Sequence, residues 1–149
     1  MKSLMNGLLP ALFLFSSAAT AERPAPLVIQ PDQIQWTLNE KSGVSSANLI
    51  GNRQAEGRFV QRLAFPASFR APMHTHDGAL SATVLSGELR LKFGANGKDV
   101  VLPAGSFVLI PPGVPHEEFA TVDTELDVHG IGPIQTIAYP GPQSVEKAR

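Results

Sequence analysis

The segment 72-PMHTHDGALSATVLSGEL-89 limits the folds that this chain can adopt. His74 and His76 stand two residues apart, so on an extended strand both side chains face the same side. A run typical of a β-strand follows, and Ser86-Gly87 predicts a tight turn after it. Two histidines on one face of a strand are typical of a metal site, which requires a third ligand from elsewhere in the chain.

Alternation of apolar and polar residues continues beyond this segment and predicts further β-strands. In 88-ELRLKF-93 the apolar residues alternate with charged ones, and Ala95-Asn96-Gly97 is a hairpin signal. The expected strands are RFVQRLAF (58–65), LSATVLS (80–86), ELRLKF (88–93), KDVVL (98–102), SFVLI (106–110), EEFA (117–120), TELDVHG (124–130) and IQTIAY (134–139). Turn residues recur about every 8–12 positions, which predicts an all-β fold, a single antiparallel β-sandwich or barrel.

The composition agrees with one small domain and excludes several functions. A chain of 149 residues suits one core, and its 13 glycines and 13 prolines argue against long helices. The formal net charge of -1 leaves no basic surface for nucleic acid. The chain has no cysteine, so a metal site must be built from His, Asp and Glu, and a thiolate zinc site is excluded.

The first 21 residues have the features of a cleavable signal peptide. Lys2 precedes an apolar run from Leu8 to Phe15, and Ala19-Thr20-Ala21 fits the small-residue cleavage rule. The alternative is an uncleaved membrane anchor, but the run is far shorter than the ~20 residues that a span needs. We therefore expect a mature chain that begins near Glu22, is periplasmic or secreted, and is not attached to a membrane.

The rest of the chain divides by composition into three parts. Residues 22–57 are expected to form an N-terminal arm with three prolines between 22 and 35, followed by a polar, Gly-rich irregular segment over 40–57. Residues 58–140 are expected to form the β-barrel domain, and 141–149 a loose C-terminal tail. Trp36, at the end of the arm, is predicted to be a core or dimer-contact residue.

A second segment, 105-GSFVLIPPGVPHEEFA-120, supplies the third histidine. Pro112-Gly113 predicts a tight turn in which the glycine is free to adopt a positive φ. The turn would place His116 at the start of a new strand. The role of this turn would be to bring His116 beside the histidine pair at 74 and 76.

The two segments together resemble the two sequence motifs of the cupin superfamily. The matching residues are His74, His76 and Gly87 in the first motif, and Gly105, Pro111, Gly113 and His116 in the second. The resemblance covers roughly residues 58–139 and implies the cupin jelly roll. The segments 81–89, 102–116 and 127–139 also look like a group of small, often exported cupin-domain proteins.

The chain departs from the family pattern at three places. Leu80 stands where the first motif has a glutamate, Ala120 stands where the second motif ends in asparagine, and the first glycine of the first motif is missing. The glutamate matters most, because it would be a metal ligand. Leu80 would instead put a hydrophobic wall beside the metal.

The resemblance implies that His74, His76 and His116 bind a divalent transition metal, with Fe, Mn, Zn, Ni and Cu all suited to imidazole ligands. The alternative is a barrel without metal, in which the histidines are hydrogen-bonded to one another or to water. Three neutral imidazoles would leave the ion with its full positive charge and with open positions for a substrate or dioxygen. Some three-histidine cupins oxidise small thiols in this way with iron and O2.

Three further residues are candidates for catalysis. Glu118 shares a strand face with His116 and could replace the lost carboxylate or act as an acid or base; the alternative is a solvated edge glutamate. His129 shares a strand face with Asp127 and is expected to be hydrogen-bonded in the core or to stand behind the metal ligands, with a substitute ligand as the other possibility. Tyr139 is placed at the mouth of the barrel.

Two functions remain open alongside the metal-free barrel. The first is a metal-dependent enzyme, an oxygenase, lyase or isomerase that acts on a small and partly apolar organic substrate. The second is a non-catalytic metal-binding or small-molecule-binding protein of the periplasm. By analogy with the family, we also expect a homodimer formed through edge strands or the arm.

Overall fold

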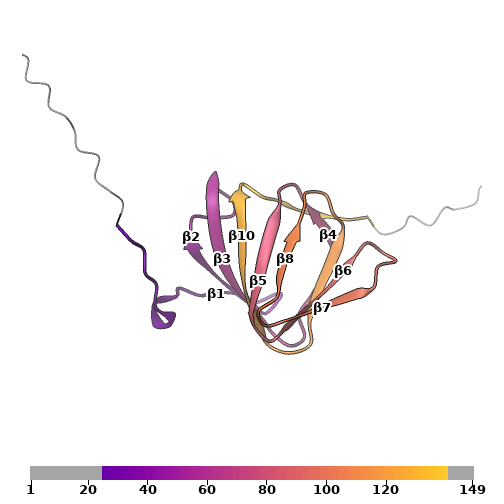
Figure 1. The fold of residues 1–149 in the computed structure, drawn as a ribbon, viewed down its shortest axis with the longest axis horizontal. Coiled ribbons are helices and arrows are strands. Elements are labelled where there is room, and N and C mark those ends of the chain that lie inside the picture. The colour runs from indigo at the N-terminus through magenta and orange to yellow at the C-terminus, as the bar shows by residue number, and fades with distance from the viewer. Residues whose placement is uncertain (1–24, 141–149) are drawn as a thin grey trace, which may run out of the picture.

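The computed structural model describes residues 25–140 as two antiparallel β-sheets packed face to face (Figure 1). The strands are β1 (Thr37–Asn39), β2 (Val44–Ile50), β3 (Gly57–Phe65), β4 (Arg70–His76), β5 (Leu80–Ser86), β6 (Glu88–Phe93), β7 (Asp99–Pro103), β8 (Phe107–Ile110), β9 (His116–Ala120), β10 (Thr124–Gly132) and β11 (Thr136–Ala138). A single 3-10 turn, η1 (Pro31–Gln33), is the only helical element in this part of the chain. The predicted all-β fold is confirmed.

The strands cross between the sheets in the way expected of a jelly roll. One sheet has six strands in the order β1-β2-β3-β10-β5-β8, and the other has five in the order β11-β4-β9-β6-β7. In Figure 1, β3, β10, β5 and β8 lie side by side in the first sheet. Because most neighbours in a sheet are distant in sequence, residues far apart along the chain meet in one cavity between the sheets.

Strict alternation of side chains builds the core. In β5 and β6 every second residue is buried, and the buried ones include Val84, Leu89 and Leu91. Phe59 and Phe65 come from one face of β3, and Leu126 comes from β10. The strand boundaries predicted from period-two patterns therefore agree with the structure to within two residues.

The N-terminal half of the first sheet corrects one expectation. The segment 40–57 was expected to be irregular, yet β2 occupies Val44–Ile50 and pairs with β3 over most of its length. Its sequence, VSSANLI, has small and polar residues with weak strand preference. Pairing with β3 overrides this weak local preference, as is common for β-structure.

Two glycines allow the turns that the motifs predicted. Gly87 links β5 to β6 with φ 73°, and a Cβ there would collide with the backbone oxygen of Asp123. Gly113 has φ 75°, and its N–H donates to the backbone oxygen of His76 at 2.8 Å. The second turn is thus bonded directly to the strand that carries the histidine pair.

The arm before β1 extends away from the sandwich (Figure 1). It is exposed from residue 25 onwards, and Trp36 is partly exposed rather than a core residue. The expected signal peptide (1–21) and C-terminal tail (141–149) lie outside the described residues. Within residues 25–140 there is no helix long and apolar enough to cross a membrane.

Candidate metal centre

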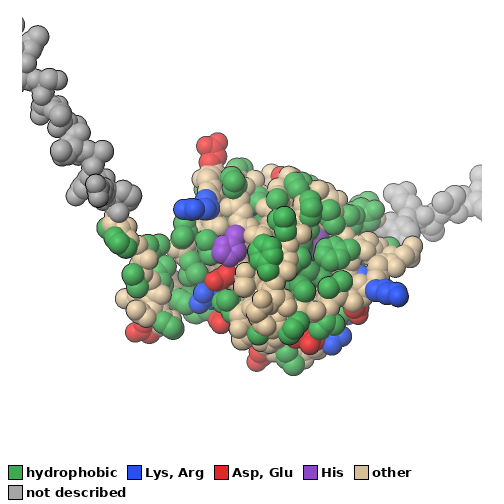
Figure 2. All heavy atoms as spheres, in the orientation of Figure 1, with side chains coloured by type: hydrophobic (Ala, Val, Ile, Leu, Met, Phe, Trp, Pro, Cys, Tyr) green, Lys and Arg blue, Asp and Glu red, His purple; other side chains and the backbone are tan. Residues whose placement is uncertain are grey.

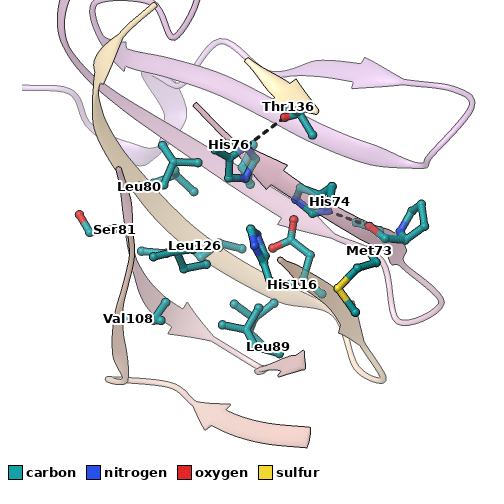
Figure 3. Close-up of a pocket in the computed structure, with 18 of the residues that line it drawn as sticks. Met73, His74, His76, Leu80, Ser81, Leu89, Val108, His116, Leu126 and Thr136 are labelled. Carbon is teal, nitrogen blue, oxygen red and sulfur yellow. Dashed lines mark hydrogen bonds between the residues drawn. The ribbon is translucent and has the colours of Figure 1, made fainter. Parts of the chain in front are cut away.

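Three histidines from two neighbouring strands meet on the inner face of the five-stranded sheet. His74 and His76 lie on β4, and His116 is the first residue of β9. The pairing of the two strands sets His74 directly opposite His116. All three side chains are buried, with exposed fractions of 6%, 6% and 1%. Figure 3 shows the three imidazoles turned toward one another.

Hydrogen bonds orient two of the rings for metal binding. The Nδ1 atom of His74 lies 2.8 Å from the backbone oxygen of Pro72, and that of His116 lies 2.9 Å from the backbone oxygen of Val114. A carbonyl oxygen can only accept, so Nδ1 carries the hydrogen in both rings. This leaves the lone pair on Nε2 free, which is the usual arrangement behind a metal-ligating histidine.

His76 has different neighbours. Its Nδ1 lies 3.0 Å from Nη2 of Arg53 and 3.3 Å from Oγ1 of Thr136. An arginine can only donate, whereas a threonine hydroxyl can accept. If Nε2 of His76 binds a metal, its Nδ1–H can therefore donate to the hydroxyl of Thr136, which lies directly opposite His76 in the pairing of β11 with β4. The backbone of Gln135 is a second hydrogen-bond partner of this ring. Thr136 also accepts a hydrogen bond from Nη2 of Arg53 at 2.8 Å.

The donor set fits a divalent transition metal. One ligand atom from each histidine lies within 4.8 Å of the other two. An ion about 2.1 Å from each nitrogen would bring the nitrogens to about 3–3.4 Å apart, which small rotations of the rings allow. Three histidines without a carboxylate suit Zn, Fe, Ni, Cu or Mn rather than Mg or Ca.

Burial lowers the pKa of two of the three histidines, His76 and His116. Burial lowers the pKa of His76 to about 4, and the positive charge of Arg53 acts in the same direction. Burial also lowers the pKa of His116. Since only a neutral imidazole can bind a metal, both shifts keep the ligands available below neutral pH.

The cluster lies in the wall of a cavity of about 460 Å3 between the two sheets. The volume is in the range of small-molecule sites. Most of the remaining wall is apolar and includes Leu80, Leu89, Val108, Leu126 and Val128 (Figure 3). Leu80, at the glutamate position of the motif, is buried in this wall, as predicted.

Glu118 is the only carboxylate among the residues that line this cavity. It faces inward on β9, two residues after His116, and lies outside the three-histidine cluster. Burial raises the pKa of its carboxyl group, while the positive charges of His74 and Arg53 act in the opposite direction. Glu118 is thus an inward carboxylate in the cavity wall, not a solvated edge residue.

The other two catalytic candidates lie away from the cavity. His129 is on the outer face of β10, because Leu126 and Val128 of the same strand point inward. Its neighbour Asp127 is held by two hydrogen bonds from Arg62, at 2.8 and 2.9 Å. Tyr139 is 42% exposed and is not among the residues that line the cavity. Neither residue is brought to the three histidines.

Sequence reasoning missed Arg53 and Thr136. Arg53 is a partly buried cation in the cavity wall, and within residues 25–140 it forms no salt bridge. It lies just after β2, in the segment expected to be irregular, and its only sequence signal is a lone charge in a polar run. Thr136 was assigned to a strand, but nothing in the pattern indicates its contact with His76.

Comparison with known proteins agrees with the geometry. The cupin domain family matches residues 62–131, which include all three histidines. Together with the two-sheet fold and the histidine positions, this match supports the cupin superfamily that the two motifs predicted. A search of curated proteins finds no sequence that matches the chain.

Solved cupin structures share the fold at low sequence identity. An RmlC-like cupin from Shewanella frigidimarina is 19% identical, with 73% of this chain and 94% of that chain covered and a TM-score of 0.60. The polyketide cyclase RemF from Streptomyces resistomycificus is 16% identical, with 79% and 89% covered and a TM-score of 0.64. A variant of salicylate 1,2-dioxygenase from Pseudoaminobacter salicylatoxidans is 15% identical, with 67% and 31% covered and a TM-score of 0.56.

The lowered pKa of His76 predicts how stability depends on pH. This pKa is about 4 in the folded chain and near the ordinary 6.5 in the unfolded chain. As the pH falls, the unfolded chain takes up a proton first, so the free energy of unfolding of the metal-free protein should decline between pH 6.5 and 4. The loss should be on the order of a few kcal/mol. Urea denaturation of chelator-treated protein measures it.

Two variants isolate the contribution of His76 to this pH dependence. His76→Gln should flatten the decline, since it removes the group that resists protonation. His129→Gln removes a histidine from the outer face and should leave the decline in place. If His76→Gln and the unaltered protein lose stability equally over this range, the assignment to His76 is wrong.

The contact between His76 and Thr136 predicts an effect on metal affinity. Thr136→Val removes the hydroxyl that can accept from Nδ1–H of His76, and should weaken Zn2+ binding by about 10–100-fold. Thr136→Ser keeps the hydroxyl and should bind nearly as the unaltered protein does. Competition against a coloured chelator measures both affinities. Equal affinities for the Val and Ser variants would show that Thr136 does not orient His76.

Proposed function

We propose that this chain is a metal-dependent enzyme that acts on a small organic substrate in an oxygenase, lyase or isomerase reaction. The observation that carries the proposal is the meeting of three buried histidines, one inward carboxylate and one partly buried arginine in a cavity of ligand size. His74, His76 and His116 would hold the metal. The metal, when bound, would polarise a substrate carbonyl or carboxylate or bind dioxygen.

The cavity indicates the kind of substrate. Its wall is mostly aliphatic, so the body of the substrate is apolar. Arg53 is the only arginine or lysine among the lining residues, which favours a substrate with one anionic group. Glu118 would move a proton on the substrate, and its raised pKa allows it to act as either acid or base.

The structural neighbours support this class of reaction without deciding it. They include proteins described as a polyketide cyclase and a salicylate 1,2-dioxygenase. Their identity to this chain is low, so they bear on the fold directly and on the reaction only by analogy.

A second candidate function is non-catalytic binding of a metal or small molecule. The placement of His129 and Tyr139 outside the cavity favours it, because Glu118 is then the only residue of the three catalytic candidates near the histidines. Such a protein would retain the metal and bind the same apolar ligand, but would not convert it. In the enzyme, Glu118 would transfer a proton to or from the substrate, whereas in the binding protein it would only line the cavity.

Export and dimerisation complete the proposal. We propose that cleavage after Ala21 releases the mature protein into the periplasm or outside the cell, as the residue pattern indicates. We also propose a homodimer. The apolar residues Leu27, Val28 and Trp36 of the arm and Phe107 and Leu109 of edge strand β8 are exposed, and Figure 2 shows hydrophobic side chains on the face that includes β8. A second copy of the chain could cover them.

Replacement of Glu118 tests the enzyme directly. Glu118→Gln should lower kcat by about 10²–10⁴, the usual contribution of a positioned acid or base, and should leave the metal content unchanged. The assay uses protein loaded with Fe2+, Mn2+ or Zn2+ and a panel of small, largely apolar carboxylic acids. Oxygen uptake measures oxygenase activity, and product analysis measures lyase or isomerase activity.

Glu117→Gln is the matched control. Glu117 is the adjacent residue on β9, faces outward and pairs with Arg70 at 3.6 Å. The Glu117→Gln variant should keep full activity. Ligand binding without turnover by any metal form would favour the binding protein. Equal turnover by the Glu118 and Glu117 variants would show that Glu118 is not the acid or base.

A further inference from the structure

A second cavity, of about 580 Å3, lies beside the metal-site cavity and has a different chemical lining. The residues that line it are Asn48, Asn52, Arg53, Gln54, Gln61, Ile134, Gln135 and Thr136. Five of these eight residues are carboxamides, and none is acidic or aromatic. We call it the carboxamide cavity. Residues 25–140 contain ten Asn and Gln side chains, and half of them line this one cavity, where Gln61 is partly buried and the other four are exposed.

One of these carboxamides, Gln61, stands where an apolar residue is expected. Gln61 faces the same side of β3 as Phe59 and Leu63, and therefore interrupts an apolar stripe. Asn48 on β2 lies directly opposite Gln61. The two polar side chains are therefore neighbours on the inner face of the sheet, next to the apolar cavity that Leu63 lines.

Much of the hydrogen-bonding capacity of the carboxamide cavity is unused. Nε2 of Gln61 donates to Oδ1 of Asn48 at 3.3 Å, and the backbone N–H of Gln54 donates to Oδ1 of Asn52 at 2.8 Å. Within residues 25–140, the side-chain amides of Gln54 and Gln135 have no hydrogen-bond partner among the side-chain bonds that the structure contains. Each amide offers both a donor and an acceptor.

We propose that the carboxamide cavity binds an uncharged, hydroxyl-rich small molecule of the polyol or monosaccharide type. A hydroxyl group both donates and accepts, and so do the carboxamides that line the cavity. A cationic ligand would require carboxylates, and the lining has none. An anionic ligand would pair with Arg53 alone and would leave the acceptor oxygens of the five carboxamides without a donor.

The site is next to the metal centre but does not depend on it. Arg53 and Thr136 line both cavities and separate them. Arg53 is held through both its side chain and its backbone, because its backbone oxygen also accepts a hydrogen bond from the N–H of Ile134 at 2.9 Å. Binding in the carboxamide cavity can therefore be measured on chelator-treated protein, and its failure would say nothing against the metal site.

The test follows the side-chain amide signals of Asn and Gln in 15N-labelled, chelator-treated protein by NMR. The protein is titrated with D-glucose, D-galactose, D-mannose and myo-inositol up to tens of millimolar, and separately with sodium acetate and putrescine as charged probes. We expect at least one polyol to produce saturable shifts in several side-chain amides, and the charged probes to produce none. No saturable shift with any polyol, or saturation by acetate or putrescine alone, would overturn the proposal.

Variants locate the binding. The double variant Gln54→Ala/Gln135→Ala removes two exposed carboxamides whose side-chain amides have no hydrogen-bond partner in residues 25–140. The fold should therefore survive, and the backbone amide spectrum checks this. Loss of about two neutral hydrogen bonds should weaken polyol binding by about tenfold or more. Gln35→Ala removes an exposed carboxamide outside the cavity and should leave the affinity unchanged. Equal affinities for the double variant and Gln35→Ala would place the binding elsewhere and overturn the proposal.

Discussion

The pairing of β4 with β9 is the constraint on which the site depends. Its register sets His74 against His116, and the alternation of β4 brings His76 to the same face. The turn before β9 is bonded to β4 through the N–H of Gly113 and the backbone oxygen of His76. A shift of one residue in this pairing would turn the inward side chains of β9 to the outer face, since the side-chain period of a strand is two.

The charges around the centre define its chemistry as much as the ligands do. Leu80 replaces the carboxylate of the family motif, so a bound divalent ion would keep its full charge. Arg53 adds a second positive charge beside His76. Glu118 is the only negative group among the residues that line the cavity, which leaves an excess of positive charge in an apolar space. With a metal bound, such a cavity would favour a substrate that brings its own negative charge, as the proposed function holds.

The same arginine joins the two cavities of the sandwich. On one side it meets the histidine cluster, and on the other it meets five carboxamides. The inner face of the six-stranded sheet is thus divided into an apolar part near the metal centre and a polar part near β2. A cupin domain of this size can therefore offer two chemically distinct binding surfaces without a second domain.

Much of this structure could be predicted from sequence, because period-two alternation and turn glycines are local signals. The strands from residue 58 onwards and the meeting of His74, His76 and His116 followed from such signals and from motif spacing. β2 could not be predicted, because its small polar residues form a strand only through pairing with β3. The positions of Arg53 and Thr136 depend on which segments become neighbours in the fold, and no local pattern encodes that, whereas the inward face of Glu118 followed from its spacing to His116.

The most direct measurement of the central claim is the metal content of the protein purified without chelators, by elemental analysis, beside His74→Ala/His116→Ala. The account predicts close to one transition-metal ion per chain, lost in the double variant, because the three histidines supply all the protein ligands. A protein that contains no metal and does not regain any when Fe2+, Mn2+, Zn2+, Ni2+ or Cu2+ is added would contradict it, and so would a double variant that keeps its metal.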